Sequence, residues 1–333
     1  MKAFTVNKYG KGILQLTELV EPAVGEHDVL VQIHSAGVNL LDPLTRNGVF
    51  KFFLPYRIPF ILGHDLAGVV TKVGSEVTKF KIGDEVYSRP RDFRIGTFAE
   101  YISVDENDVA RKPNNLTMDE AGSIPLVGLT VWQVLVETVN LKKGQKIFIQ
   151  AGSGGVGTIA IQLAKHLGAY VATTTSADNT DLVKRLGADL VINYKTEDFE
   201  TKLKDYDVVL HSNRDPKILK KSLQVLKPGG HLVSLVGPPT LEFARQLSLP
   251  WYLKPVTIFL SYGVKRMARK LNVKFTFLFM RAEGGQLGEV AKLIEAGVIK
   301  PVIDKVFPFE QANEALAYVE MGRSKGKVVI KVR

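Results

Sequence analysis

A short apolar run followed by a glycine-rich turn is the feature that most constrains this chain. Residues 147–149 are apolar and lead into Gly152, Gly154 and Gly157, which satisfy the pattern G-x-G-x-x-G, and helical spacing of apolar residues follows. In this strand–turn–helix context the pattern indicates nucleotide binding, because the glycines allow close approach to a pyrophosphate and the helix start presents free N–H groups. We therefore expect the cofactor to contact Gly152, Ser153, Gly154, Gly155, Val156 and Gly157. A tight strand-to-helix turn without a ligand is the alternative.

The next expected strand, residues 170–175, indicates which dinucleotide binds. It ends at Thr175 and Ser176, about where a nicotinamide enzyme places the residue that faces the adenosine ribose. A carboxylate there would accept hydrogen bonds from a 2′-hydroxyl and would repel a 2′-phosphate, whereas small hydroxyl side chains leave room for the phosphate. The expected cofactor is therefore NADPH, although Asp178 would oppose the phosphate if its side chain pointed inward.

Composition excludes several classes of chemistry. The chain has 333 residues and no cysteine, so it has no disulfide, no thiolate nucleophile and no cysteine-ligated zinc. Residues 1–6 do not resemble the apolar core of a signal peptide, and no apolar stretch reaches the length of a membrane span. On these grounds we expect a cytoplasmic protein.

The formal net charge is +10. A basic balance often indicates a nucleic-acid partner, but here lysine and arginine are scattered except in residues 265–274, and no basic motif with interleaved aromatic residues is present. We therefore expect no nucleic-acid partner. The charge is explained by a solvated surface and an anionic cofactor.

The chain is expected to fold as two domains, one of them split. Residues 1–124 read as short strands separated by glycine-containing turns, which is typical of a small irregular β-barrel. Residues 125–280 alternate strand and helix, with strands at 146–150, 170–175, 190–194, 207–212, 231–236 and 273–280, as in a six-stranded doubly wound parallel sheet. Residues 281–333 return to β character and are expected to complete the N-terminal domain.

Several short blocks, in order along nearly the whole chain, carry a family resemblance. They are residues 36–42 (AGVNLLD), 62–70 (LGHDLAGVV), 96–101 (GTFAEY), 128–130 (GLT), 186–189 (LGAD) and 326–329 (GKVV), together with the glycine turn. The chain resembles the medium-chain dehydrogenases/reductases, specifically the zinc-free quinone oxidoreductase (zeta-crystallin-like) branch. The resemblance implies an α/β protein with a GroES-like barrel as catalytic domain and an inserted Rossmann domain that binds NADPH.

The resemblance also bears on metal. Zinc enzymes of the wider family place a cysteine ligand where this chain has Asn39 and a histidine where it has His64. Without a thiolate, a complete three-ligand site cannot be assembled from the sequence, and a His64 held by hydrogen bonds is the simpler interpretation. We expect no metal.

Hydride transfer to a carbon that is already electrophilic fits a metal-free site, and a quinone or an α,β-unsaturated carbonyl provides such a carbon. The protein then needs a hydrogen bond to the oxygen that gains charge. By resemblance, Asn39 lies at the floor of the site and is one candidate donor. Tyr56 is the other candidate, for hydrogen bonding or stacking. An asparagine bonded to its own turn and a surface tyrosine are the alternatives.

The resemblance further implies which residues hold the cofactor. Beyond the glycine turn, the expected contacts are Thr130 near the nicotinamide, Thr175, Ser176 and Tyr194 at the ribose phosphate, and Val236 and Gly237. Two departures stand out: Asn179 aligns where many relatives carry a lysine, and residues 211–213 (HSN) replace an aspartate and a glycine-rich stretch. The first weakens the expected preference for NADPH without reversing it.

Other functions and partners remain open from the sequence. The same fold occurs in binding proteins with a structural, RNA-associated or membrane-associated role, and enoyl-CoA reduction is a further enzymatic option. The β-prone run 273–280 is expected at a sheet edge, where in the family it meets its twin in a homodimer. The apolar stretch 249–260 and the basic residues after it indicate either an ordinary core helix with a solvated basic face or a cap that touches a membrane surface.

Overall fold

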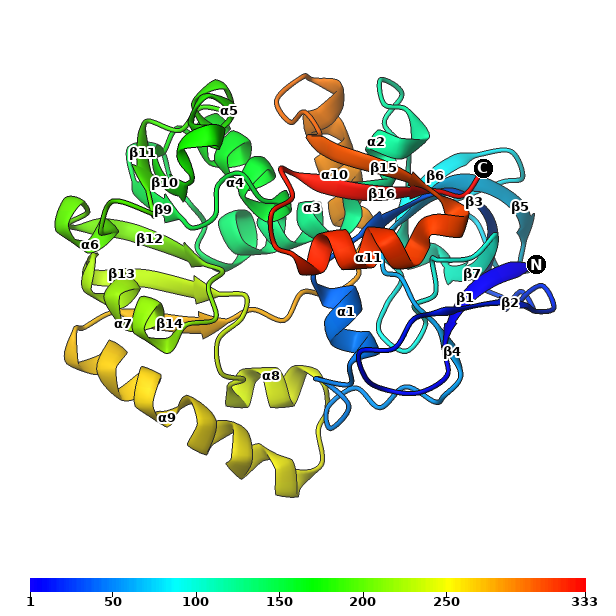
Figure 1. The fold of residues 1–333 in the computed structure, drawn as a ribbon, viewed down its shortest axis with the longest axis horizontal. Helices are drawn as coiled ribbons and strands as arrows, with labels where there is room; N and C mark the ends of the chain where they lie inside the picture. Colours follow the sequence, from blue (N-terminus) through cyan, green and yellow to red (C-terminus); the bar gives the residue numbers. More distant parts are fainter. The chain divides into compact units, whose positions relative to one another are not determined.

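The computed structural model describes residues 1–333, which separate into two compact units (Figure 1). Unit 1 comprises residues 1–130 and 281–333, and unit 2 comprises residues 131–280. The first boundary was expected at 124/125 and the second at 280/281. None of the helices combines the length and apolarity that a bilayer-spanning segment requires.

Unit 2 is built on one parallel six-stranded sheet. Its strand order is β11-β10-β9-β12-β13-β14, so the order reverses between β9 and β12, where a doubly wound sheet binds nucleotides. The strands are β9 (Lys146–Ile149), β10 (Tyr170–Thr175), β11 (Leu190–Asn193), β12 (Tyr206–His211), β13 (Leu226–Ser234) and β14 (Lys274–Phe277). Ile147, Phe148 and Ile149 are all fully buried, as expected for a central strand covered on both faces.

Helices connect these strands and cover both faces of the sheet, as can be followed in Figure 1. The longer ones are α4 (Gly155–His166), α5 (Thr180–Arg185), α7 (Pro216–Gln224), α8 (Leu241–Gln246) and α9 (Lys254–Lys270). Shorter pieces are a π-helix (Gln133–Thr138), the 3₁₀ turns η3 (Ala177–Asn179) and η4 (Trp251–Leu253), and α6 (Phe199–Lys202). The core packs Phe148 against Phe199, with ring centroids 4.9 Å apart.

Unit 1 contains a seven-stranded sheet and a three-stranded sheet. The larger has the order β15-β16-β3-β5-β6-β8, with β7 also paired to β3, and the smaller has the order β2-β1-β4. The strands are β1 (Lys2–Val6), β2 (Gln15–Glu18), β3 (Asp28–Val38), β4 (Phe60–Ile61), β5 (Leu66–Val73), β6 (Glu85–Ser88), β7 (Tyr101–Asp105), β8 (Val109–Arg111), β15 (Ile303–Pro308) and β16 (Lys327–Lys331). β16 pairs antiparallel with β3, so residues distant in sequence share one sheet.

Helices of unit 1 close the ends of these sheets. They are α1 (Leu41–Arg46), α2 (Met118–Gly122), α3 (Pro125–Trp132), α10 (Gly284–Glu295) and α11 (Ala312–Glu320), with 3₁₀ turns η1 (Glu106–Asp108) and η5 (Phe309–Gln311). Thr117 and Glu120 form a capping box at the start of α2. α11 contributes Ala312, Ala315 and Leu316 to the same apolar core as Val31 and Ile33 of β3.

Some expected boundaries differ from the structure. α3 continues directly into the π-helical turn Gln133–Thr138. β13 begins at Leu226, which pairs with Tyr206 of β12; an irregularity follows, and regular pairing resumes at Val208 and His231. β14 covers only the first half of the expected run 273–280. These differences concern element ends, which depend on hydrogen-bond geometry more than on apolar periodicity.

Candidate functional site

The glycine turn of unit 2 brings strand, turn and helix too close together for side chains at two positions. A β-carbon on Gly152 would lie 2.1 Å from the Thr173 hydroxyl oxygen, and one on Gly157 would lie 2.3 Å from the Ala151 carbonyl oxygen. Both contacts are impossible, so these two positions require glycine. They correspond to the first and third glycines of a dinucleotide-binding turn.

Gly154 has the opposite surroundings. A β-carbon there would meet only the Ala151 carbonyl oxygen, at 3.4 Å, so the space above it is open. Gly154 is also the residue before α4 and provides no side-chain cap, and the N–H groups of the first helical turn have no partner within the helix. This open, positively polarised helix start fits a pyrophosphate, and Ser153, Gly155 and Val156 belong to the same turn.

A cluster of small polar side chains lies beside this turn. The Thr175 hydroxyl donates to Ser153 Oγ at 2.9 Å, and Asn179 Nδ2 lies 3.3 Å from both Ser153 Oγ and Ser176 Oγ. The buried Oδ1 atom of Asn179 has no partner. Asn179 thus contributes an amide at the position where many members of the resembled family carry a lysine.

The remaining residues near this cluster are accessible. The Tyr194 backbone N–H donates to the Thr175 carbonyl oxygen at 3.3 Å, while its side chain is 61% exposed and free to contact a ribose phosphate. Asp178, in η3, is exposed and has no ion-pair partner. The cluster therefore offers hydroxyl and amide groups without a cation, and carries one nearby carboxylate.

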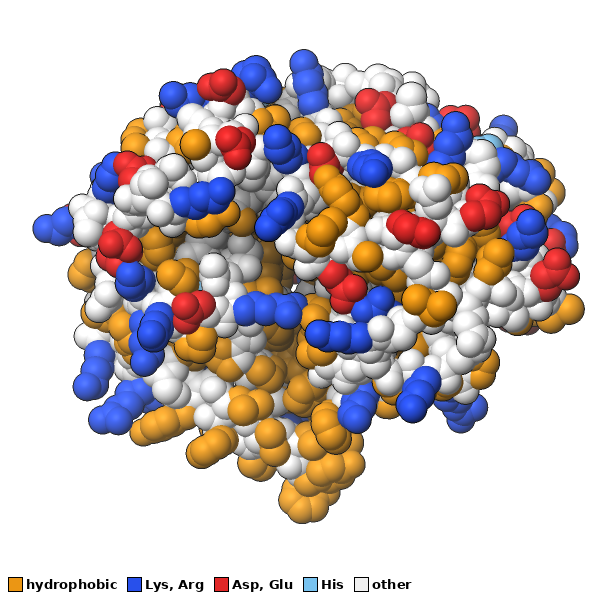
Figure 2. All heavy atoms as spheres, in the orientation of Figure 1, with side chains coloured by type: hydrophobic (Ala, Val, Ile, Leu, Met, Phe, Trp, Pro, Cys, Tyr) orange, Lys and Arg blue, Asp and Glu red, His pale blue; other side chains and the backbone are white.

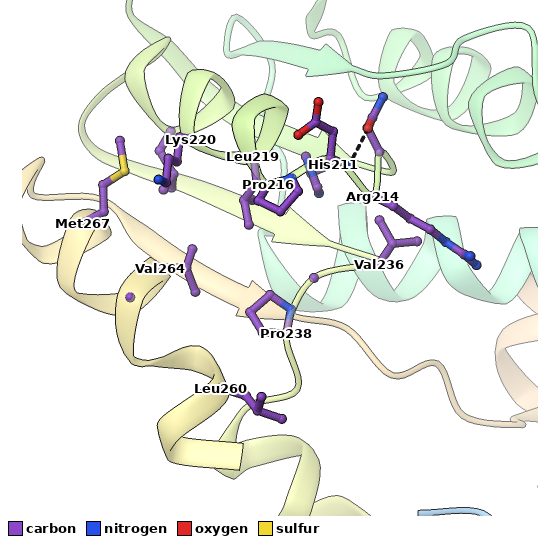
Figure 3. Close-up of a pocket in the computed structure, with 15 residues that line it drawn as sticks. His211, Arg214, Pro216, Leu219, Lys220, Val236, Pro238, Leu260, Val264 and Met267 are labelled. Atoms are coloured by element: carbon purple, nitrogen blue, oxygen red, sulfur yellow. Dashed lines mark hydrogen bonds between the residues drawn. The ribbon is translucent and has the colours of Figure 1, made fainter. Parts of the chain in front are cut away.

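Val236 and Gly237 follow β13 at the carboxyl end of the same sheet. They line a cavity of about 470 Å³ together with His211, the last residue of β12 (Figure 3). Ser212 is held by the Gln150 side chain, which accepts its N–H at 3.1 Å. Burial lowers the pKa of His211 to about 4, so its imidazole is neutral at physiological pH.

In unit 1, Asn39 belongs to a buried polar cluster with Asp65 and Lys327. The Asn39 amide donates to Asp65 Oδ2 at 2.9 Å, and the Lys327 ammonium lies 3.1 Å from the same oxygen while donating to Asn39 Oδ1. Asp65 Oδ1 accepts the backbone N–H of Leu126 at 2.7 Å. A buried carboxylate needs hydrogen-bond donors and an opposite charge. Asp65 has both, because the Lys327 ammonium, at the first residue of β16, pairs with it.

His64 is engaged in a second buried pair. Its Nδ1 atom lies 2.6 Å from Asp42 Oδ1, and Asp42 Oδ2 accepts the Asn39 backbone N–H at 2.6 Å. No three His, Asp or Glu side chains converge in an arrangement that would hold a metal ion. A zinc ion does not fit this cluster, because the Lys327 ammonium already binds the oxygens of Asn39 and Asp65 and a second cation beside it would be repelled.

The other two predicted residues of unit 1 are Thr130 and Tyr56. The Thr130 hydroxyl donates to the Leu126 carbonyl oxygen at 2.7 Å within α3 and keeps its acceptor lone pairs. Tyr56 stacks on Phe60 with centroids 5.0 Å apart, and its hydroxyl oxygen accepts the Phe93 N–H at 3.5 Å. Burial raises the pKa of Tyr56 well above its usual value, so its hydroxyl stays protonated and able to donate.

Sequence reasoning missed Asp42, Asp65 and Lys327 as members of this cluster. A signal was available for all three, because Asp42 ends the block 36–42, Asp65 follows His64 directly and Lys327 lies in the block 326–329. What the sequence did not indicate is that Lys327 and Asn39 meet, since 288 positions separate them.

Family models match both parts of the chain. Residues 25–114 match the alcohol dehydrogenase GroES-like domain, and residues 186–330 match the zinc-binding dehydrogenase model. The residues of this chain do not match the zinc binding in the name of the second model. The chain has no cysteine, and the Lys327 ammonium occupies the buried cluster of Asn39 and Asp65.

Individual relatives and structures are similar over nearly the whole chain. The chain is 34% identical to the human mitochondrial NAD(P)H oxidoreductase RTN4IP1, covering 100% of this chain and 89% of the relative. It is 37% identical to the 2-methylene-furan-3-one reductase of Solanum lycopersicum, covering 99% and 79%. The quinone oxidoreductase structure from Coxiella burnetii superposes with a TM-score of 0.87 at 30% identity, covering 100% and 99%.

These names correct the expected location. Relatives from zebrafish, mouse, human and cattle are named as mitochondrial, and one from Arabidopsis thaliana as chloroplastic, so they point to an organelle and the expectation of a cytoplasmic protein is wrong. The expectation failed because the composition of a globular chain does not separate the cytosol from an organelle interior.

The cofactor and the enzyme class are also settled at this level. Quinone and alkenal/one oxidoreductases are among the relatives, and similar structures include an Escherichia coli quinone oxidoreductase complexed with NADPH. Together with the glycine turn, they identify an NADPH-dependent oxidoreductase with a GroES-like domain and a Rossmann domain. The chain belongs to the medium-chain dehydrogenase/reductase family, in its quinone oxidoreductase branch.

Proposed function

We propose that this enzyme reduces a quinone or an α,β-unsaturated carbonyl with NADPH and without a metal. The observation that carries the proposal is the buried ammonium of Lys327, bound by Asn39 and Asp65 where a metal-dependent relative would need open ligands. With no Lewis acid to polarise an alcohol or a simple ketone, the acceptor must be electrophilic by itself.

The chain's own residues bind and orient in this proposal. NADPH, when bound, supplies the hydride. The open helix start at Gly154 would hold the pyrophosphate, and Ser153, Thr175, Ser176 and Asn179 would donate to the 2′-phosphate. Thr130 and Val236 are the proposed contacts at the nicotinamide end.

Tyr56 is the better of the two candidate donors to the acceptor oxygen. The Asn39 amide is buried at 6% exposure and already donates to Asp65, so a further partner would break the cluster. The Tyr56 hydroxyl only accepts, from Phe93 at 3.5 Å, which leaves its proton available. Its raised pKa keeps that proton in place until charge develops on the acceptor.

The names of several relatives support this acceptor class. They include a 2-methylene-furan-3-one reductase, an alkenal/one oxidoreductase and a quinone oxidoreductase, whose substrates all contain a carbonyl conjugated to a carbon–carbon double bond. Conjugation spreads the developing charge onto an oxygen, where one hydrogen bond from the protein stabilises it.

Turnover provides the direct test. The purified protein, incubated with NADPH and a panel of quinones, enones and enoyl thioesters, is expected to oxidise NADPH with quinones or enones, and to do so equally after dialysis against EDTA. NADPH binding with no oxidation across the panel would favour a non-catalytic binding protein, and reduction of enoyl thioesters alone would favour an enoyl-CoA reductase. Loss of turnover in EDTA that zinc restores would contradict a metal-free site.

Removing one hydroxyl tests the proposed donor. Tyr56→Phe is expected to lower kcat about 10²- to 10³-fold, the usual effect of losing one donor to an oxyanion, with NADPH affinity unchanged. Tyr318→Phe, which removes a hydroxyl bonded to Asp304 at 2.8 Å, is the matched control and should leave kcat unaltered. An unchanged kcat in Tyr56→Phe would exclude this tyrosine as the donor.

The phosphate cluster sets the coenzyme preference. NADPH is expected to bind about ten- to a hundredfold more tightly than NADH, or about 1.4 to 3 kcal/mol, because hydroxyl and amide groups hold the phosphate without a cation. Ser176→Asp should invert the preference, and Asn179→Lys should strengthen NADPH binding while leaving NADH unaffected. Equal dissociation constants in fluorescence titrations would instead implicate Asp178.

The ammonium of Lys327 is expected to stabilise unit 1. Lys327→Met leaves the Asp65 carboxylate buried without its cation, which should lower the free energy of unfolding by about 3 to 5 kcal/mol. Adding Asp65→Asn should recover much of that loss. Lys331→Met, at the exposed end of the same strand, is the control. The wild type and the three variants are compared by urea unfolding. Equal midpoints in all four would refute a stabilising role of the Lys327 ammonium.

We also propose a homodimer through unit 2. β14 pairs only with β13, so its other edge is open. α9 packs beside β14 and exposes Phe259, at 82%, and Tyr262; Trp251, in the preceding turn η4, is exposed as well. Figure 2 shows this apolar patch at the lower end of the molecule, over the start of α9. Exposed aromatic residues clustered in this way usually mark an interface.

Light scattering at micromolar concentration should give twice the 36.8 kDa of one chain, and Phe259→Asp should shift the protein toward the monomer. Val20→Asp, at a 90% exposed apolar position in unit 1, is a control with the same change in charge. A monomeric wild type would refute the dimer. Sedimentation with anionic vesicles at low salt would then show whether this patch contacts a membrane surface.

A further inference from the structure

The cavity of about 470 Å³ at the carboxyl ends of β12 and β13 extends into a groove between α7 and α9 (Figure 3). This volume is within the range of sites for small organic molecules. We propose that the α7–α9 groove binds a neutral, largely apolar molecule that carries one carbonyl or hydroxyl oxygen, and that this oxygen pairs with Nε2 of His211. The groove shares Val236 and Gly237 with the expected cofactor contacts, whereas His211 and the α7 and α9 side chains that line it are not among those contacts.

His211 gives the groove its specificity. The residue is 1% exposed; its Nδ1 atom lies 2.9 Å from the Ser234 hydroxyl oxygen, and its Nε2 atom has no partner. A buried polar atom left without a hydrogen bond is destabilising, and a ligand oxygen in the groove would remove that penalty. Because Ser234 can donate to Nδ1 or accept from it, Nε2 can accept from a hydroxyl or donate to a carbonyl.

The other polar groups around the groove are already engaged or lie at its rim. Asn213 Oδ1 accepts the Asp215 N–H at 2.8 Å, and Asp215 Oδ1 accepts the Lys217 N–H at 2.8 Å as the cap of α7. Arg214 and Lys220 are exposed, and with Asp215 they place charges of both signs at the mouth. The net charge of this exposed rim is a single positive charge that solvent screens, and the walls below it are apolar, so a neutral ligand is favoured.

The walls are apolar. Leu219 and Leu223 from α7, Leu260, Val264 and Met267 from α9, and Val236 from the loop after β13 line the groove. Met267 can adjust its unbranched side chain to ligands of different shape. Such walls fit a ring or a short hydrocarbon chain and offer no second hydrogen bond, which is why one oxygen is specified.

Gly263 keeps the groove open. It lies within α9, where glycine is less favourable than alanine, and a β-carbon added to it would meet no atom within 4 Å. A larger side chain here would therefore occupy the groove without displacing the helix. This position supplies a variant that blocks the site and does not endanger the fold.

The test uses 1-naphthol, a phenol that does not accept hydride, and 1-methylnaphthalene, which has the same rings and a methyl group in place of the hydroxyl. With the full chain saturated with NADPH, 1-naphthol should bind by titration calorimetry with an affinity about tenfold higher than 1-methylnaphthalene, the value of one hydrogen bond. His211→Phe should abolish this difference, whereas His231→Phe, in the neighbouring strand and outside the groove, should retain it. Gly263→Leu should prevent binding of both compounds, with NADPH affinity unchanged.

Three results would overturn the proposal. Neither compound binding at its solubility limit would mean that the groove holds only water. Equal affinities of the two compounds in the wild type would mean that His211 makes no hydrogen bond to the ligand. Loss of 1-naphthol binding on adding NADPH would make the groove part of the cofactor site. Since 1-naphthol is not a hydride acceptor, none of these results depends on the turnover assay.

Discussion

The interaction on which unit 1 depends is the pairing of Asp65 with Lys327. A carboxylate removed from water needs both an opposite charge and hydrogen bonds to be tolerated. Asp65 obtains these from the Lys327 ammonium, the Asn39 amide and the Leu126 N–H. Each donor comes from a different segment, so one buried charge fixes the β3–α1 turn, the start of α3 and the start of β16 at a single point.

The binding site of unit 2 depends on backbone groups and not on a buried charge. Its glycine turn works through missing side chains: Gly152 and Gly157 allow strand, turn and helix to touch, and Gly154 leaves the helix start uncovered. The backbone then supplies the charge complement, which no side chain could deliver as close to a pyrophosphate. Side chains enter only at Ser153, Thr175 and Asn179, where discrimination between cofactors is needed.

The sequence predicted the parts of the structure that are locally encoded. The six strands of unit 2 and the glycine turn follow from apolar runs and glycine spacing within a few residues, and the structure has them in the expected order. The Asn39–Asp65–Lys327 cluster could not be predicted, because three polar residues far apart in sequence show no periodicity. For the same reason Asn39 was considered a possible substrate contact, although its amide is occupied by Asp65.

The phosphate site could be predicted in part from the sequence. Thr175 and Ser176 were expected from their place after β10, but Asn179 was identified only as an absent lysine. Its amide in fact joins Ser153 and Ser176, a contact set by the short turn η3 and not visible in residue type alone. The unpaired Nε2 of His211 is likewise a property of packing, since the sequence shows only an unusual residue at the end of a strand.

The position of Lys327 also determines the order in which the molecule can be completed on the ribosome. Asp65 and Asn39 emerge early, and their cation is made only after the whole of residues 131–280. All six strands of the nucleotide-binding sheet lie within that intervening stretch, so this sheet can form first. Until β16 is synthesised, the Asp65 carboxylate lacks the cation that pairs with it in the folded chain, so the buried cluster of unit 1 is completed only with the last strand.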